Sequence, residues 1–306
     1  MNAWIQRGLM GLKLLLCMLA LLWGWNSGSV ALGIFLVALI FGLGGAVIFL
    51  SFAALSRINR LAAIFRPAPL LRAWLREWLA CERVFSWQQP FAEFRYPDNL
   101  PAGASERGVL LLHGFTCNRG LWNPWMRGLR KKGTPFVALT LEPAFGSIDA
   151  YADQIEVGVQ ALLALSGLPP VIVAHSMGGL AVRAWLRRYG HSQQGAAPAA
   201  HIMTLGSPHS GTWMAQFSPA VNSRQMRRGS IWLATLARDE SPELAARFTC
   251  YFSYFDQVVC PARADVLPGS RSIEVAESGH LSMLFDDQIF SDLQHLLSEK
   301  SPEASG

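Results

Sequence analysis

The chain has 306 residues, 51% of them hydrophobic, and a formal net charge of +5. Its basic character belongs to residues 1–88, which carry eight Lys or Arg against two Glu, whereas the remainder carries 18 basic against 19 acidic residues. A nucleic-acid-binding protein would carry its cations on the folded domain, so this distribution argues against nucleic acid as a partner and fits anionic lipid headgroups.

The five cysteines are widely spaced and form neither a CxxC pair nor a Cys/His cluster at zinc-ligand spacing. They are Cys17, Cys81, Cys117, Cys250 and Cys260. The sequence therefore predicts neither a disulfide framework nor a metal site, and it implies no cofactor.

Two long apolar segments open the chain. Leu9–Trp25 is almost wholly apolar apart from Lys13, and Val30–Leu55 contains no charge and is long enough to cross a hydrocarbon core of about 30 Å. Only four turn-forming residues separate them, which predicts a transmembrane hairpin over residues 1–56. A secretory signal peptide is the competing interpretation, but no small-residue cleavage site is followed by a soluble sequence. A lipoprotein site at Cys17 lacks the small residue expected before it.

Cations flank this hairpin on one side only. Arg7 and Lys13 lie near its start, five arginines follow its second segment, and the turn between the segments carries no charge. The positive-inside rule then places both ends of the hairpin in the cytoplasm.

Residues 57–100 read as a basic amphipathic linker. After Pro67 and Pro69, the stretch Leu70–Trp87 places apolar residues at helical spacing with arginines beside them. This helix could lie on the membrane surface or pack on the following domain, because both arrangements need the same apolar face.

Residues 101–300 alternate short β-rich runs with helical stretches, which predicts a mostly parallel sheet with helices on both faces. The expected strands are Val109–Leu112, Phe136–Leu139, Val171–Ala174, Ile202–Leu205, Cys250–Phe255 and Ser272–Val275. The expected helices are Leu121–Lys132, Asp149–Leu165, Gly178–Arg188 and Leu284–Leu297. Chemistry in such sheets gathers at the carboxyl ends of the strands.

A nucleophile elbow is predicted at the third of these strand ends. The run from Val171 to Gly179 (VIVAHSMGG) is an apolar strand entering a small-x-Ser-x-Gly turn and then a helix. The small residues Ala174 and Gly178 allow the close backbone approach that this sharp turn needs, so Ser176 is the expected nucleophile. Ala174 departs from the more frequent glycine, which its size makes tolerable.

A serine needs a histidine base oriented by a carboxylate, and this type of fold supplies them in the order Ser, Asp or Glu, His. His280 lies in a loop after the last predicted strand, and Asp256 directly follows the run ending at Phe255. We therefore expect Asp256 and His280 to complete a triad with Ser176. As alternatives, Asp256 could be a turn residue and His280 a polar group at a helix start.

An oxyanion hole requires two backbone N–H groups directed at the developing charge. The loop His113-Gly114-Phe115 follows the first strand, so the amides of Phe115 and Met177 are the expected donors. His113 is expected to brace this loop, and Cys117 to be a buried apolar residue, because no histidine is arranged for it.

With these motifs, residues from about Gly108 to Leu297 resemble the α/β-hydrolase lipases, particularly bacterial triacylglycerol lipases and glycosylphosphatidylinositol-deacylase-like esterases. The segment Gly206–Thr212 (GSPHSGT) is typical of those lipases, and so is Met226–Leu233 (MRRGSIWL). The resemblance implies an α/β-hydrolase fold, ester hydrolysis by Ser176, and, with the hairpin, a bacterial inner membrane location with a cytoplasmic catalytic domain. The hairpin lies outside the resemblance, so the secretion and calcium binding of such lipases are not carried over.

Residues 212–247 lie between two predicted strands and would suit a cap or lid over an acyl pocket. Ordinary helix packing explains the same apolar residues, which include Trp213, Phe217 and Ile231. His209 precedes every plausible acid in the chain and is expected to be a structural turn residue.

The sequence thus predicts a membrane-anchored serine ester hydrolase acting on a carboxylic, plausibly lipid, ester. Transfer of the acyl group to another alcohol and cleavage of a thioester use the same triad and remain alternatives. The non-enzymatic alternative is a catalytically inactive membrane scaffold.

Overall fold

The computed structural model describes residues 2–59, 66–190 and 199–298. Its centre is a six-stranded sheet with strand order β2-β1-β3-β4-β5-β6, in which every neighbouring pair is parallel. The strands are β1 (Val109–Leu112), β2 (Phe136–Leu139), β3 (Val171–His175), β4 (His201–Leu205), β5 (Phe248–Phe252) and β6 (Arg271–Glu274). The predicted α/β architecture is confirmed.

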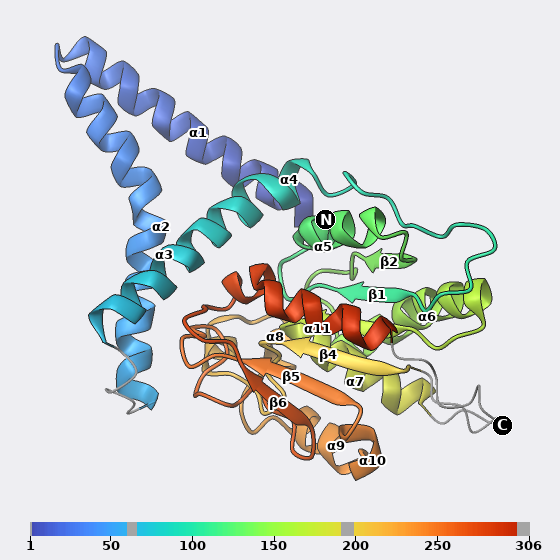
Figure 1. Cartoon of the computed structure of the whole chain (residues 1–306). Coiled ribbons are helices and arrows are strands. Elements are labelled where there is room, and N and C mark those ends of the chain that lie inside the picture. Colours follow the sequence, from blue (N-terminus) through green and yellow to red (C-terminus); the bar gives the residue numbers. More distant parts are fainter. Residues whose placement is uncertain (1, 60–65, 191–198, 299–306) are drawn as a thin grey trace.

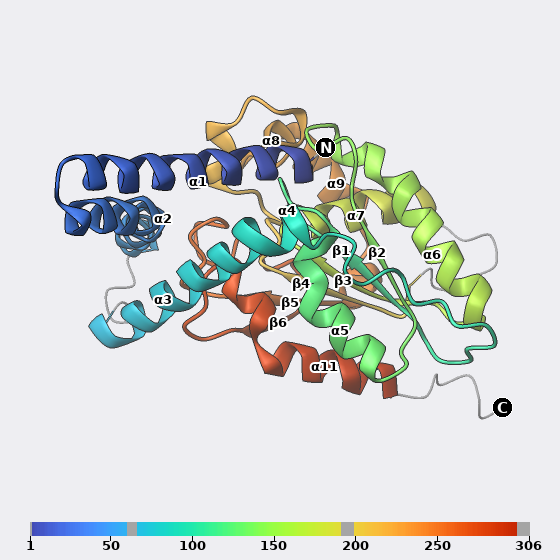
Figure 2. The ribbon, with the colours of Figure 1, turned by 90° about the horizontal axis from the view of Figure 1, so that it is seen from above.

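Helices cover both faces of the sheet because successive strand side chains point to opposite faces. Leu110 and Leu112 pack with α6 (Ala152–Ser166) and α7 (Met177–Tyr189), whereas Val109 and Leu111 pack with α5 (Asn123–Lys131) and α11 (Asp287–Ser298). Figure 2 shows α5 and α11 on one side of the strands and α6 on the other. Burial on both faces explains why β1 and β3 read as continuous apolar runs.

Two long helices precede this domain and form a hairpin. They are α1 (Asn2–Asn26) and α2 (Val30–Asn59), and both are long and apolar enough to cross a membrane by length and composition. They approach closely near the turn, where a Cβ on Gly24 would lie 2.6 Å from the backbone nitrogen of Gly33. Figure 1 shows the hairpin turn as the part of the chain farthest from the sheet.

The helix α3 (Pro67–Arg83) lies between the hairpin and the sheet domain (Figure 1). It begins at Pro67, earlier than the sequence pattern indicated, because proline is well tolerated in the first turn of a helix. Ala73, Glu77 and Ala80 form its buried side, and the Trp74 indole donates a hydrogen bond of 2.7 Å to the Gly45 carbonyl of α2. A π-helical turn (Val84–Gln88) and the short α4 (Gln89–Phe91) follow.

The base of the hairpin is tied to the same region by polar contacts. Gln6 donates to the side chain of Gln89 at 3.0 Å, Arg7 to the Pro90 carbonyl at 2.6 Å, and Lys13 forms an ion pair with Glu82 at 2.8 Å. The hairpin, α3 and α4 therefore form one packed unit.

Residues 212–247 contain a 3-10 turn (Trp213–Phe217) and the helices α8 (Val221–Gln225), α9 (Ile231–Arg238) and α10 (Pro242–Ala245). Leu233 and Leu236 are buried in the core cluster that includes α7, whereas Phe217 and Ile231 are 83% and 86% exposed. The segment therefore packs on the domain with one apolar face and leaves other apolar side chains at the surface.

Candidate active site

Ser176 lies in the sharp turn between β3 and α7. Its backbone has φ 55° and ψ −127°, a strained conformation for a residue with a side chain, and its N–H donates to the Leu205 carbonyl at 2.9 Å. A Cβ on Gly178 would lie 2.8 Å from the His113 carbonyl oxygen, so glycine is required there. This is the geometry of a nucleophile elbow, which exposes the hydroxyl at a helix N-terminus.

Asp256 and His280 are brought together by the loops that follow β5 and β6. The Nδ1 atom of His280 lies 2.7 Å from Oδ2 of Asp256, and both side chains are buried. The other carboxylate oxygen of Asp256 accepts the N–H groups of Val258 and Val259 at 2.8 and 2.7 Å. Because Nδ1 donates to the carboxylate, Nε2 of the neutral ring is free to take a proton.

The Asp256–His280 pair meets the elbow at the end of β4. Gly206 follows Leu205, whose carbonyl binds the Ser176 amide, and a Cβ on Gly206 would lie 2.9 Å from Asp256 and 3.1 Å from the His280 Nδ1. Gly206 also has φ 55°, a value that favours glycine. The GSPHSGT segment thus begins with a glycine that both positive φ and close contact require.

Two opposing effects act on the pKa of His280. Burial lowers it, whereas the charge of Asp256, the hydrogen bond to Asp256 and the more distant charge of Glu77 raise it, and the net result is a pKa above the usual value. A base with a raised pKa holds the proton firmly once it has taken it from the serine.

The two expected oxyanion donors belong to segments next to Ser176. Met177 is the first residue of α7, where N–H groups have no helical partner, and Gly114 approaches so closely that a Cβ on it would lie 2.6 Å from the Ser176 Cβ. Phe115 follows Gly114, and its ring meets that of Phe145 edge to face at 5.7 Å. The loop between β1 and α5 therefore lies against Ser176, and the assignment of the Phe115 and Met177 amides to an oxyanion hole stays a prediction.

Three other residues considered from the sequence, His113, Cys117 and His209, are buried. His113 contacts the Gly114 carbonyl through Nδ1 at 2.7 Å and accepts the Leu141 amide at 2.8 Å, and burial lowers its pKa to about 4. Burial raises the pKa of Cys117 to about 12, which keeps it a thiol. His209 is buried beside Thr204 at 3.1 Å, and burial lowers its pKa well below the usual value.

Two residues near the site were missed by the sequence argument. The ring of His175 lies 4.6 Å from that of His280, and its Nε2 donates to the His280 carbonyl at 3.1 Å. Glu77 of α3 accepts backbone amides from the loop that carries His280. The available signal for Glu77 was an acid within the stripe formed by Ala73 and Ala80.

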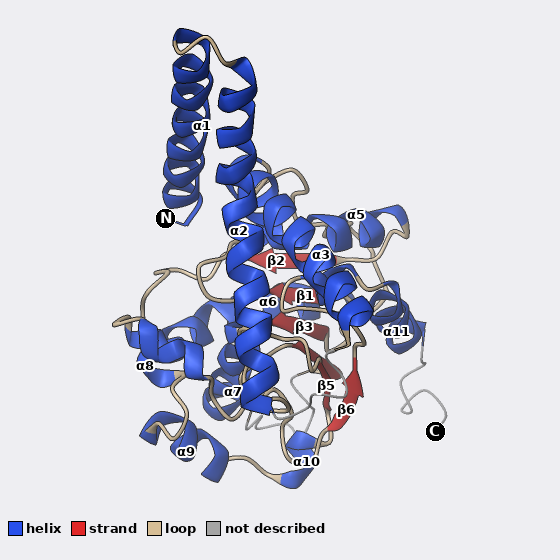
Figure 3. Ribbon diagram, turned by 90° about the vertical axis from the view of Figure 1, so that its left-hand side faces the viewer, coloured by secondary structure: helices blue, strands red, loops and turns tan. Residues whose placement is uncertain are grey.

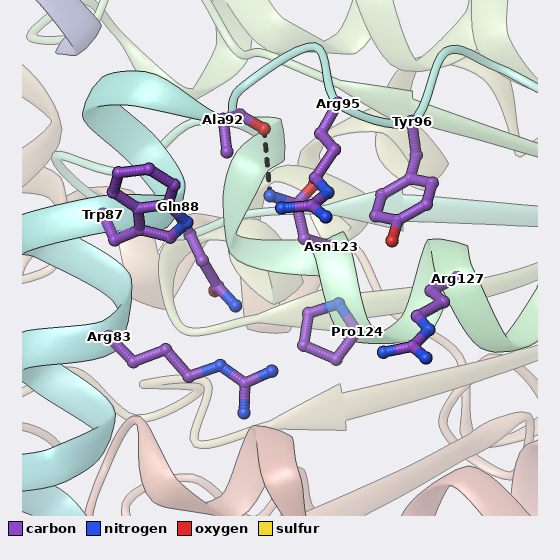
Figure 4. Close-up of a pocket in the computed structure, with 9 residues that line it drawn as sticks. All are labelled: Arg83, Trp87, Gln88, Ala92, Arg95, Tyr96, Asn123, Pro124 and Arg127. Carbon is purple, nitrogen blue, oxygen red and sulfur yellow. Dashed lines mark hydrogen bonds between the residues drawn. The ribbon is translucent and has the colours of Figure 1, made fainter.

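The pocket of Figure 4 lies away from this constellation and has a volume of about 340 Å³. Three arginines from different segments, Arg83, Arg95 and Arg127, line it with polar and aromatic neighbours, and no member of the expected triad does. It is therefore not the acyl site. Within residues 2–59, 66–190 and 199–298, no group of three or more His, Cys, Asp or Glu is placed to hold a metal.

The fold and the elbow define an α/β hydrolase. The chain belongs to the alpha/beta hydrolase family, whose model matches residues 109–272. No curated protein sequence matches the chain.

Solved lipases share the fold at low sequence identity. The mature lipase BlEst2 of Bacillus licheniformis is 14% identical with a TM-score of 0.55, and the alignment covers 66% of this chain and 97% of that one. Lipase B of Aspergillus fumigatus is 15% identical with a TM-score of 0.56, and the alignment covers 69% of this chain and 58% of that lipase. At such identities the likeness establishes the common fold alone.

Proposed function

We propose that the protein is a membrane-anchored serine hydrolase that cleaves carboxylic esters, with a lipid ester as the substrate class. The observation that carries the proposal is the hydrogen-bonded Asp256–His280 pair meeting the strained Ser176 turn at Gly206. That arrangement supplies a nucleophile, a base and an orienting carboxylate in the chain order of α/β hydrolases.

In the proposed reaction, Ser176 Oγ attacks the ester carbonyl while His280 Nε2 takes its proton. The amides of Phe115 and Met177 stabilise the tetrahedral oxyanion, and Asp256 holds the imidazolium. The proton then passes to the departing alcohol and leaves an acyl-enzyme. Water, deprotonated by His280, attacks this ester and releases the acid. The reaction needs no cofactor.

The lipid assignment is supported by the apolar surfaces around the strand ends. In Figure 1 the strand arrowheads point toward the side on which α2 lies, and Figure 3 views that side. Phe52 of α2 contacts Phe255, the neighbour of Asp256, with ring centroids 6.2 Å apart. The hairpin therefore runs beside the catalytic edge, and the exposed Trp213 and Phe217 would meet apolar chains there.

In this proposal the hairpin of residues 1–56 is the anchor, residues 57–100 connect it to the enzyme, and residues 101–300 form the catalytic domain with residues 212–247 as its cap. In the same proposal the catalytic domain lies on the cytoplasmic side of a bacterial inner membrane, and the flanking arginines support this orientation through the positive-inside rule. Acyl transfer or thioester cleavage would use the same residues, and product analysis with competing alcohols distinguishes these reactions.

The test is fluorophosphonate labelling of the detergent-solubilised full chain, followed by hydrolysis of p-nitrophenyl esters of increasing length. We expect wild type to be labelled, Ser176→Ala to lose labelling and several orders of magnitude in rate, and Ser218→Ala in the cap segment to keep both. A higher rate on long chains would support the lipid assignment. An unlabelled wild type would contradict the hydrolase proposal and favour the scaffold.

A further inference from the structure

Glu77 is a buried carboxylate outside the region that defines the family. It lies in α3, its side chain is fully shielded from solvent, and it faces the loop between β6 and the 3-10 turn Ser282–Phe285. That loop carries His280. An acid supplied by the connecting segment therefore lies next to the proposed catalytic base.

The carboxylate is held entirely by uncharged donors. Its Oε1 accepts the Leu281 amide at 3.0 Å and the Gln257 side chain at 2.8 Å, and its Oε2 accepts the amides of Leu281 and Ser282 at 3.1 and 2.8 Å. No lysine or arginine in the described part of the chain forms an ion pair with it. Burying a charge that has no ion-pair partner is unfavourable, and these hydrogen bonds must offset that cost.

Glu77 contacts residues that neighbour Asp256 and His280 in the chain. Gln257, which donates to Glu77, follows Asp256 in the chain and accepts the His280 amide through its own Oε1 at 3.3 Å. Leu281 and Ser282 follow His280. A Cβ on Gly279 would lie 2.5 Å from the Glu77 carboxyl carbon, so a larger residue before the histidine would have to displace the carboxylate.

We propose that Glu77 is a positioning residue for the hydrolase reaction, holding the His280 loop in its working geometry and stabilising the imidazolium by its charge. This inference rests on the proposed function, because it assigns Glu77 a role through His280. Glu77 does not touch the substrate in this proposal, and it acts through the loop that it binds.

The same contact links the active site to the hairpin. On its other side α3 packs against α2 through Trp74 and Trp78, which stack with ring centroids 5.5 Å apart, and a Cβ on Gly45 would lie 3.1 Å from the Trp78 ring. The exposed ion pair between Arg72 and Glu277 adds a second contact between α3 and the same loop. The position of the loop that carries His280 thus depends on α3, a helix that packs against the hairpin.

The charged and titratable groups around His280 come from three directions. Asp256 contributes from the β5–β6 loop, Glu77 from α3 and His175 from the end of β3, and burial keeps His175 neutral by lowering its pKa. The charge of Asp256 also acts on Asp265, whose pKa burial raises well above the usual value, so Asp265 keeps its proton where an exposed aspartate has lost it. The carboxylates of Asp256 and Glu77 raise the His280 pKa against the effect of burial, so removing the Glu77 charge should lower that pKa.

The decisive experiment compares Glu77→Gln with wild type in detergent, using p-nitrophenyl butyrate across the pH range and rates normalised to fluorophosphonate-titrated sites. A glutamine presents an NH₂ group to amides that need an acceptor, so we expect kcat/KM to fall about 10- to 100-fold. We also expect the acidic limb of the pH profile to move to lower pH, because the neutral base persists further into acid.

Three further variants separate charge from packing. Glu77→Asp keeps the charge, so its acidic limb should stay near that of wild type while its rate remains reduced. Gly279→Ala displaces the carboxylate without removing it and should lower the rate. Glu82→Gln, on the same helix but paired with Lys13, should change neither quantity.

Because the rates are normalised to fluorophosphonate-titrated sites, a fraction of unfolded protein does not lower the rate measured per active site. A wild-type rate in Glu77→Gln would overturn the proposal, and so would a slower enzyme with an unmoved acidic limb, since packing alone explains that result. Failure of the wild-type chain to react with fluorophosphonate would instead contradict the hydrolase function itself, so the two failures are distinguishable.

Discussion

Asp265 is a buried acid that the proposed reaction does not use. It is 1% exposed, and no other described residue forms a hydrogen bond with either of its carboxyl oxygens. Burial, with a smaller effect from the Asp256 charge, raises the Asp265 pKa well above its usual value. The folded protein therefore keeps a proton that the unfolded chain releases, and this destabilises the fold as pH rises through the window between the two pKa values.

Replacing Asp265 with asparagine should remove that pH dependence. We expect Asp265→Asn to melt at a higher temperature than wild type at neutral pH, with a difference that shrinks as pH falls toward the ordinary aspartate pKa. Thermal melts across this range, with the surface variant Asp239→Asn as control, measure the effect. An Asp265→Asn variant that is less stable at neutral pH would contradict a protonated, unpaired acid.

Individual site residues differed in how far the sequence could predict them. Ser176, Asp256 and His280 could be proposed from the sequence because each lies after the carboxyl end of a strand, and parallel strands end at one edge of the sheet. Glu77 was not, because its role depends on where α3 docks, and an amphipathic pattern does not specify which surface it covers. The same limit applies to His175, the last residue of β3, whose contact joins residues 105 positions apart in the chain.

The helix α7 and the cap segment are joined by a buried ion pair. Arg183, 1% exposed at its side chain, binds Glu240 through two hydrogen bonds of 2.6 and 2.8 Å and donates to the His209 carbonyl at 2.9 Å. Removing one member of such a pair leaves an uncompensated charge in the interior. The turn at Ser176 precedes α7, so this pair also ties the helix behind that turn to residues 212–247.

We therefore expect Glu240→Ala to lower the free energy of unfolding by about 3–5 kcal/mol. Arg188→Ala breaks the exposed pair with Asp153 and should cost at most about 1 kcal/mol. Urea unfolding of the full chain in detergent gives both values. Equal losses in the two variants would mean that burial does not distinguish the pairs.

The elements of the sheet domain were predicted well because apolar runs bounded by turns are a local signal. The strands β1 and β2 begin and end at the predicted residues, whereas β5 starts two residues earlier and ends at Phe252. The role of residues 212–247 could not be assigned from the sequence, because short amphipathic segments are compatible with both a cap and ordinary helix packing. The structure shows that Leu233 packs inward while Ile231 faces outward.

At the scale of the molecule, the hairpin is the feature whose orientation can be tested most directly. A cysteine at Ser27, in the turn, should react with a membrane-impermeant maleimide in intact spheroplasts, whereas one at Glu243 in α10 should react only after lysis. Burial of four native cysteines keeps the background low. The reverse pattern would overturn the cytoplasmic assignment, and labelling of both only after lysis would mean that the turn does not cross the bilayer.

The polar contacts at the hairpin base also constrain the biosynthesis of the protein. The Gln6 side chain donates a hydrogen bond to the Thr116 carbonyl, 110 positions later in the chain, and Lys13 pairs with Glu82, 69 positions later. The first turns of α1 are therefore synthesised before either partner, and they form these contacts only after both partners have followed. If the hairpin is the membrane anchor that we propose, its first turns must stay accessible to the residues that follow, so that the catalytic domain is assembled onto the base of a hairpin already made.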